Sequence, residues 1–352
     1  MAFLIIIIIL ALLFDFINGF HDAANSIATI VSTKVLTPFQ AVLWAALFNF
    51  VAFFIAKFIL QDFGIANTVS KTVFEQFITL PIIFSGIVAA ILWNLATWWL
   101  GIPSSSSHTL IGGFGGAALM ATRNIEAIHW GGSKGVIVIA IFIFLAPIIG
   151  MLIATIFSII VQHLSKKANP HKANHWFKRL QLVSSALFSV GHGMNDSQKV
   201  MGIISVALIA YNAANPGVLP AFMQLTEFEQ IVKTEHFDWI PLACFTVIAL
   251  GTMSGGWKIV KTMGSRITKV TPFEGVVAET AGAFTLYITE ILKIPVSTTH
   301  TISGAIIGVG ATKRLSAVRW GVTRQLLTAW LLTIPVSAAI AAGVYWIVGH
   351  FV

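Results

Sequence analysis

The stretch Ile102-Pro103-Ser104-Ser105-Ser106-Ser107-His108-Thr109 recurs later in the chain as Ile294-Pro295-Val296-Ser297-Thr298-Thr299-His300-Thr301. Each copy interrupts the middle of a long apolar segment, at about 80–120 and about 273–312. A proline ends the preceding helix, and the hydroxyl residues after it are typical of the start of a new one. Each segment therefore predicts two helices joined at a polar tip, which either cross a membrane twice or enter it and return as a re-entrant hairpin.

A second pair of motifs indicates the same duplication. Phe20-His21-Asp22-Ala-Ala-Asn25-Ser26 corresponds to Met194-Asn195-Asp196-Ser-Gln-Lys199, with Asp22 matching Asp196. Glycines stand beside both motifs, at 19 and at 191 and 193, and we expect the helix that carries each motif to be broken there.

The composition is that of an all-α, polytopic membrane protein. The 352 residues are 57% hydrophobic and only 10% charged, with a mean hydropathy of +0.89, whereas roughly a quarter of an average soluble protein is charged. The first apolar run is interpreted as a helix rather than a signal peptide, because it lacks a basic leader and a small-residue cleavage site. The single Cys244 excludes a disulfide framework and a CxxC metal site. Further segments long enough to span a bilayer run approximately over 2–33, 37–60, 135–163, 181–211, 239–257 and 325–348.

Positive charge is concentrated in three short segments. Thirteen of the 21 Lys and Arg residues fall in 164–180, 258–269 and 313–324, where there is no acidic residue. The positive-inside rule makes these segments cytoplasmic, so the net charge of +8 indicates orientation in a membrane and not nucleic-acid binding. Counting crossings from them predicts that both termini are external, in a bacterial plasma (inner) membrane.

The two motif pairs then have opposite orientations. The helix with Asp22 runs from outside to inside and the helix with Asp196 runs back, while one hairpin enters from each side. This predicts two inverted-topology repeats, 1–163 and 181–352, joined by a basic cytoplasmic linker, 164–180. Inverted repeats are typical of secondary transporters, whose substrate site lies near the membrane midplane between the repeats.

Membrane-depth charges are the first candidates for function. A charge at the bilayer centre costs at least about 2.5–3.5 kcal/mol, so each needs a partner or a water-filled cavity. Asp22 and Asp196 are candidate sites for a coupling cation or metal ion; the alternative is that each caps a broken helix. Glu279 is interpreted either as a cation or proton site or as a structural residue, and Asp15 and Glu290 as structural or interfacial.

The two hairpin tips predict an anion site. The N-terminus of a helix offers unpaired N–H groups and a positive dipole end, so two such ends at the midplane form a cradle for anionic oxygens. The alternative is that the Ser and Thr hydroxyls bond to carbonyls of their own helices. His108 and His300 are interpreted either as supporting donors or as packing residues. A Ser-His-Asp hydrolase is not expected, because Ser107 and His108 are adjacent and there is no G-x-S-x-G elbow.

The chain resembles the PiT family of inorganic phosphate transporters. The matching stretches are the two hairpin tips, Asn18-Gly-Phe-His-Asp-Ala-Ala-Asn25-Ser and Gly191-His-Gly-Met-Asn-Asp-Ser-Gln-Lys199. The resemblance implies a phosphate symporter, a homodimer, with external termini. His21 replaces the Asn that many sodium-coupled members carry before the first Asp, and Asn49 stands at a position that is Glu in the animal proteins. Both features resemble the bacterial members that couple to protons and accept metal–phosphate complexes.

The resemblance and the residue patterns together give a candidate site. The phosphate-binding candidates are Asn25, Ser104, Ser105, Ser106, Ser107, Thr109, Ser297, Thr298, Thr299 and Lys199. The coupling-cation candidates are Asp22, Asp196, Asn195, Glu279 and Asn94, of which Asp22 and Asp196 are also the metal candidates. The supporting candidates are His21, His108, His300 and Gln198.

Charge balance then predicts cation coupling. Phosphate carries between one and two negative charges near neutral pH, and each costs about 2.3 kcal/mol per 100 mV against an inside-negative potential. The cations would be protons, Na⁺ or the divalent metal of a metal–phosphate complex, and no covalently bound cofactor is expected. The alternatives are a permease for sulfate or a related oxyanion, and a phosphate-selective channel.

Overall fold

The computed structural model describes residues 1–351 apart from 62, 64, 65, 67–71, 133, 134, 229, 234–236 and 293–295, and the side chains of 232 and 233. The described chain is nearly all helical and has no β-strand, only an isolated bridge between Val73 and Ile128. The predicted all-α class is therefore confirmed. Pro295 and Ile294 of the second tip lie outside the described residues.

Among the described residues, five helical segments are long and apolar enough to cross a membrane. They are α1 (Ala2–Ser32), α2 (Pro38–Phe54) with its π-helical continuation to Leu60, α4 (Leu80–Leu100), α6 (Val136–Ser165) and α13 (Trp320–Val348). A sixth candidate is α9 (Trp239–Ser254) with α10 (Trp257–Lys261) and its continuation to Arg266, bent by 63° at the break. The other main helices are α5 (Ser106–Thr122), α7 (Pro170–Ala214), α11 (Pro272–Ile291) and α12 (Thr298–Lys313), with a short α8 (Gln230–Lys233).

Three helices begin at the same kind of local signal. Thr37, Asn169 and Thr271 precede Pro38, Pro170 and Pro272, the first residues of α2, α7 and α11. A proline at the first helical position lacks only an N–H that would be unpaired there, and the side chain before it accepts from the first turn. Because α7 begins at residue 170 and α6 ends at 165, most of the predicted 164–180 linker is helix.

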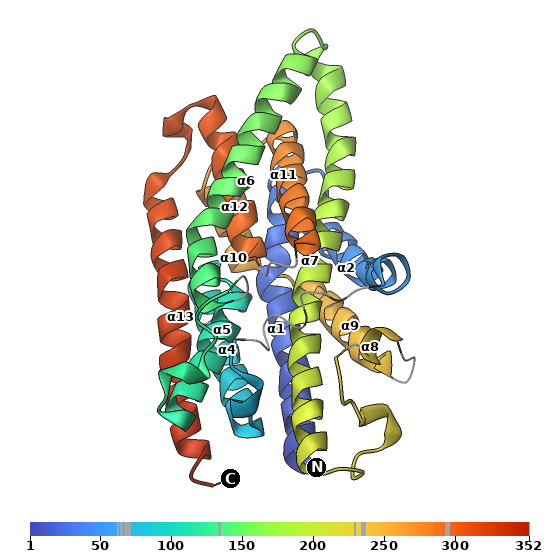
Figure 1. Cartoon of the computed structure of the whole chain (residues 1–352). Helices are drawn as coiled ribbons and strands as arrows, with labels where there is room; N and C mark the ends of the chain where they lie inside the picture. Colours follow the sequence, from blue (N-terminus) through green and yellow to red (C-terminus); the bar gives the residue numbers. More distant parts are fainter. Residues whose placement is uncertain are drawn as a thin grey trace.

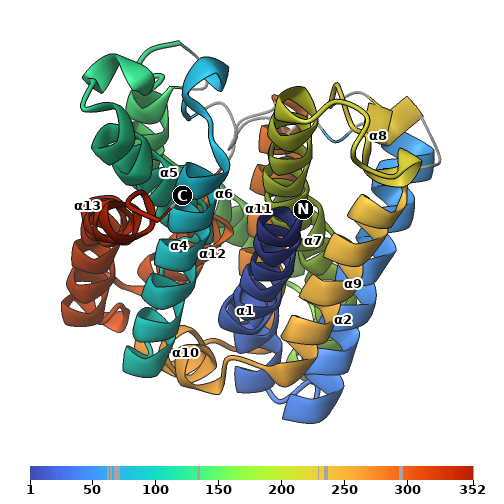
Figure 2. The ribbon, with the colours of Figure 1, turned by 90° about the horizontal axis from the view of Figure 1, so that it is seen from below.

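The two hairpins occupy opposite halves of the molecule. In Figure 1, α4 and α5 lie in the lower half and α11 and α12 in the upper half, with their tips near the middle. Both termini lie at the lower end, and α6 meets α7 at the upper end. Viewed from below, α1 and α7 stand at the centre, between α4, α5 and α13 on one side and α2 and α9 on the other (Figure 2). This arrangement is the one that an inverted repeat requires; the repeat itself stays a prediction.

The prediction that both motif helices are broken at their glycines is wrong. Both α1 and α7 run continuously through their glycines. A Cβ at Gly19 would lie 2.4 Å from the carbonyl oxygen of Ile248, and one at Gly193 would lie 2.7 Å from that of Asn49. The glycines therefore let α9 and α2 pack closely against intact helices, which is the common use of glycine between membrane helices.

Each hairpin also packs through a pair of glycines four residues apart. A Cβ at Gly116 in α5 would lie 2.1 Å from the carbonyl oxygen of Ala338 in α13, and one at Gly304 in α12 would lie 2.1 Å from that of Pro147 in α6. Gly112 and Gly308 make the matching contacts one turn away. Small residues at this spacing hold both tips against a long helix.

We expect Gly304→Ala to destabilise the protein by about 1–3 kcal/mol, because the added methyl group must push α12 away from the Pro147 carbonyl. Thermal unfolding in detergent measures the change. Gly343→Ala on α13 is the matched control, since a Cβ there meets nothing within 4 Å. Equal melting temperatures for the two variants would contradict this packing role.

Candidate functional site

One face of α1 is polar and buried. Asp15, Asn18, Asp22, Asn25 and Thr29 follow one another at intervals of three or four residues, and none is more than 2% exposed. α7 runs antiparallel beside this face, because the amino group of Met1 at the start of α1 donates to the Tyr211 hydroxyl near the end of α7, at 2.7 Å. The two predicted motifs thus face each other across one helix pair.

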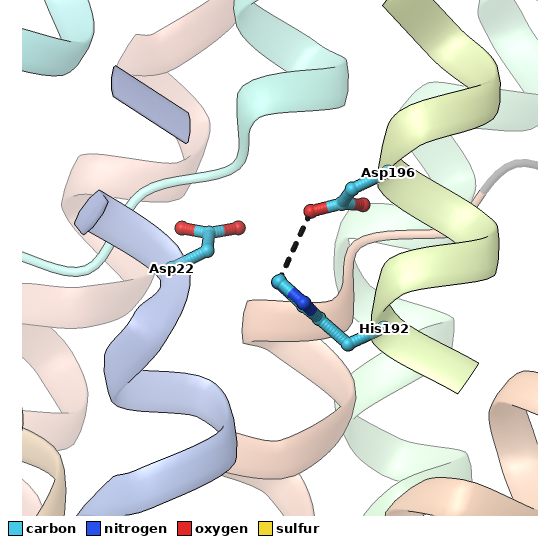
Figure 3. Close-up of side chains that lie close together, drawn as sticks. All are labelled: Asp22, His192 and Asp196. Atoms are coloured by element: carbon cyan, nitrogen blue, oxygen red, sulfur yellow. Dashed lines mark ion pairs between the residues drawn. The ribbon is translucent and has the colours of Figure 1, made fainter. Parts of the chain in front are cut away.

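Asp22, His192 and Asp196 form the core of the site. In each residue, one side-chain atom that could bind a metal ion lies within 4.8 Å of the corresponding atoms of the other two, and all three residues are buried. Figure 3 shows the two carboxylates on α1 and α7 with the imidazole directed between them. The structure therefore brings together the two aspartates that the repeat paired, and we name these three residues the carboxylate–imidazole cluster.

The partners of Asp196 show how this carboxylate is held. It accepts hydrogen bonds from Lys199 Nζ at 2.6 Å and from Asn18 Nδ2 at 3.2 Å. His192 Nε2 lies 3.3 Å from Asp196 Oδ2, the oxygen that also accepts from Asn18. Lys199, predicted to orient phosphate, is thus paired with Asp196 in this structure.

A chain of hydrogen bonds orients the His192 ring. The Thr252 hydroxyl donates to the carbonyl of Ile248 at 2.9 Å, and its oxygen accepts from Asn49 Nδ2 at 2.8 Å. His192 Nδ1 lies 3.3 Å from the Asn49 oxygen, and Nε2 lies 3.3 Å from Asp196 Oδ2. The ring therefore presents Nε2 to the carboxylates, the position from which a neutral histidine binds a cation.

His192 is the site residue missing from the sequence prediction. It stands four residues before Asp196 on α7, so helical spacing places both side chains on one face. That i, i+4 spacing was the signal that could have found it. Its counterpart before Asp22 is Asn18, which bonds to Asp196 instead.

The two hairpin tips meet beside this cluster. Asn25 Nδ2 lies 3.2 Å from the Thr298 hydroxyl and 3.0 Å from that of Thr299. Thr299 donates in turn to the carbonyl of Ser104 in the other tip, at 3.2 Å. In the described part of the chain, the Asn25 Oδ1 and Ser107 Oγ atoms are buried without a hydrogen-bond partner. Asn25 is one turn from Asp22, so the tips and the carboxylates share one small region.

Some of the predicted hydroxyls are engaged within their own helices. Ser105 accepts from the backbone N–H of His108 at 3.4 Å and Ser297 from that of His300 at 3.2 Å, so both are helix caps. Thr109 donates to the Ser105 carbonyl at 2.6 Å. The residues left in the first turns, facing the tip region with their backbone N–H groups, are Ser106, Ser107, Thr298 and Thr299.

His21 links the cluster to the first tip. Its Nδ1 lies 2.7 Å from Asp22 Oδ1, and its Nε2 lies 3.1 Å from the Thr97 hydroxyl and 3.4 Å from that of Ser104. The histidine therefore contacts both the Asp22 carboxylate and Ser104, a predicted phosphate-binding residue. His108 and His300 pack against each other with ring centroids 5.0 Å apart, and His300 stacks on Trp330.

Three other predicted residues contact groups outside the carboxylate–imidazole cluster. Glu279 accepts from Thr29 and Ser184, each at 2.5 Å, and from Gln181 at 3.1 Å. Thr29 is seven residues beyond Asp22, about 10 Å along the helix. Asn94 accepts from Thr109 at 3.2 Å, and Gln198 donates to Glu290 at 2.9 Å. Asn195 is buried next to Asp196 in sequence, and neither of its amide atoms has a partner among the described residues.

A cavity of about 790 Å³ approaches the first tip from the side of the basic segments. Its lining runs from Arg266 and Arg324 to Gly101, Ile102 and Thr97. Thr97 is the residue that contacts both His21 and Ser104. Thr97 and Ser104 are themselves buried, so the cavity ends at the layer of residues behind the tip.

Comparison with known proteins identifies the family of the chain. Residues 18–341 match the model of the family described as "Phosphate transporter family". Proteins named "Probable low-affinity inorganic phosphate transporter" are 46% identical in Rhizobium meliloti, over 97% of this chain and 95% of that protein, and 43% identical in Bacillus subtilis, over 97% and 96%. A solved structure titled "The sodium-dependent phosphate transporter" superposes with a TM-score of 0.80 at 25% identity, covering all of both chains.

Proposed function

The chain belongs to the phosphate transporter family, and we propose that it is a symporter that imports inorganic phosphate together with cations by alternating access. The observation that carries the proposal is the position of Asn25. It contacts the second hairpin tip at 3.0 Å, and it stands one helical turn from Asp22 of the carboxylate–imidazole cluster. An anion cradle and a cation site thus share one helix.

Charge supports coupling to cations. The cluster and its neighbour Lys199 contribute two carboxylates and one ammonium group. A bare phosphate placed one turn away would meet a net negative charge in a medium of low dielectric constant. A cation held by Asp22 and Asp196 removes this repulsion, so that phosphate and cation bind better together than separately.

The donor set of the cluster supports a divalent metal as one of these cations. An imidazole nitrogen with two carboxylate oxygens is a set that transition metals such as zinc take, whereas hard cations prefer oxygen alone. His192 Nε2 would be one ligand, and Asn49, 3.3 Å from Nδ1, would hold the ring in place. We propose that a metal–phosphate complex is carried as substrate, with its metal in the cluster and its phosphate oxygens at Asn25 and the first turns of the tips.

The cavity supports the route to the cytoplasm. Its arginines, Arg266 and Arg324, lie in the basic segments that we propose to be cytoplasmic, and the two guanidinium groups attract phosphate. We propose that this cavity is the cytoplasmic end of the phosphate route. We further propose that the protein is a homodimer in a bacterial plasma membrane, with external termini and one hairpin tip gating each side.

Uptake of labelled phosphate into proteoliposomes tests the function. We expect accumulation above equilibrium when an inward proton or sodium gradient is imposed, and faster uptake when a divalent metal is present. Competition by excess sulfate separates the oxyanion permease alternative, for which sulfate would inhibit as well as phosphate does. Equilibration without accumulation under every gradient would contradict symport and favour a channel.

A further inference from the structure

Asp15 differs from the other buried acids of the chain. It is fully buried on α1, and neither of its carboxylate oxygens has a hydrogen-bond partner among the residues that the structure describes. By contrast, Asp22 contacts His21 at 2.7 Å, Asp196 accepts from Lys199 at 2.6 Å and Glu279 accepts from three donors. Each of those carboxylates is stabilised by donors that Asp15 lacks.

The surroundings of Asp15 contain one cation and one competing acid. Asp15 is seven residues before Asp22, and Lys199 is three residues after Asp196 on the antiparallel α7, so both lie on the same side of the cluster, toward the termini. The hydrogen bond from Asn18 to Asp196 at 3.2 Å sets the register of the two helices, so Asp15, three residues before Asn18, faces Lys199, three residues after Asp196. The charged groups nearest Asp15 are therefore Asp196 and Lys199, and the Cys244 thiol on α9 is also close to it. The neighbouring α2 and α4 carry no ionisable side chain.

An ionised carboxylate in this position would be costly. Burying a charge without hydrogen bonds is far less favourable than burying the neutral acid, and no water-exposed edge is open to Asp15 here. The Lys199 ammonium group, the cation that could stabilise it, is already bonded to Asp196. In this state Asp15 is therefore the neutral, protonated partner of a buried Lys199–Asp196 ion pair.

We propose that Asp15 binds the proton that is coupled to phosphate transport, and that Asp15 and Asp196 compete for the single ammonium group of Lys199. This inference rests on the proposed symport. It adds to that proposal a proton site outside the carboxylate–imidazole cluster, on a residue that sequence patterns assign only a structural or interfacial role.

The exchange balances in charge and protons. When water reaches Asp15, its carboxyl group releases one proton to that water, and the carboxylate so formed takes the Lys199 ammonium from Asp196. Asp196 is then an unpaired carboxylate, which makes the site beside Asn25 one unit more negative and expels phosphate. Protonation of Asp15 returns Lys199 to Asp196 and removes that extra charge, so phosphate binds when the proton is bound. Lys199 keeps its proton throughout, so one proton moves in the same direction as each phosphate.

The test compares Asp15→Asn with the wild type in proteoliposomes. Asparagine has nearly the shape of the neutral acid but cannot release a proton. We expect uptake driven by an imposed proton gradient to fall at least tenfold, while exchange of external for internal phosphate continues, because exchange needs no net proton release. Glu126→Gln, on an exposed loop, is the matched acid-to-amide control and should keep both activities.

Other results would contradict the proposal. Proton-driven uptake by Asp15→Asn at the wild-type rate would overturn the proposal. So would loss of exchange in a variant that melts at the wild-type temperature, since Asp15 would then be needed for substrate movement itself. If Asp15→Asn does not fold, Asp15→Ser, which also has no proton to release, takes its place in the same comparison. Wild-type uptake that ignores the proton gradient rejects this inference alone, whereas no phosphate uptake at all rejects the proposed function.

Discussion

Asp196→Asn is expected to lower phosphate uptake at least 100-fold. The substitution removes one of the two carboxylates of the cluster and leaves the buried Lys199 ammonium group without its partner at 2.6 Å. Losing a charge-assisted contact to the bound cation, worth about 3 kcal/mol, corresponds to a factor of about 100. The broken ion pair separately destabilises the fold by about 3–5 kcal/mol. Initial rates of labelled phosphate uptake in proteoliposomes measure the loss.

A double variant separates loss of stability from loss of function. Asp196→Asn with Lys199→Met removes both charges, so we expect its melting temperature to recover most of what the single variant loses. Uptake should not recover, because the cation site still lacks a carboxylate. Glu126→Gln controls for a change from acid to amide at an exposed position. Uptake by the single variant within twofold of wild type would show that Asp196 is not part of the transport site.

Asn25→Asp is expected to weaken phosphate binding by a factor on the order of 1,000. The change preserves shape but places a negative charge where the side chain now contacts the Thr298 and Thr299 hydroxyls. Two like charges about 4 Å apart repel by about 4 kcal/mol at an effective dielectric constant of 20, so the charge outweighs any lost hydrogen bond. Titration calorimetry with phosphate on the purified protein measures the dissociation constant.

Asn25→Ala is the matched variant for this prediction. It removes the amide without adding charge, and a single lost hydrogen bond of about 1 kcal/mol corresponds to roughly fivefold weaker binding. The ratio between the two variants therefore isolates the effect of charge at the hairpin tips. If both bind phosphate equally well, the anion does not bind beside Asn25.

The duplicated motifs predicted the main features of the site, because repetition carries spatial information. Asp22 matches Asp196 in the sequence, and the two lie in one cluster in the structure. The glycine breaks were wrong because a glycine beside a polar motif is compatible both with a bent helix and with close packing. Which of these applies depends on a neighbour distant in sequence, such as Ile248 against Gly19.

Other parts of the site depend on helix register, which sequence patterns do not supply. Asp15 and Lys199 come together only because α1 and α7 run antiparallel at one particular offset. Likewise, the engagement of Glu279 by Thr29, Gln181 and Ser184 involves three helices, so a structural and a cation-binding role were equally compatible with its sequence. The caps at Ser105 and Ser297 were distinguishable from phosphate ligands only through their backbone contacts.

The continuity of α1 has a consequence for the efficiency of energy conversion. Asp15, Asp22 and Asn25 are carried by one unbroken helix of 31 residues. If that helix tilts or slides, all three side chains move as a rigid body, so none can be exposed to one side of the membrane while the others remain facing the opposite side. A break at Gly19 would have divided the helix between Asp15 and Asp22. In the proposed symporter, the continuous helix therefore opposes slippage, which is the flow of cations along their gradient without phosphate.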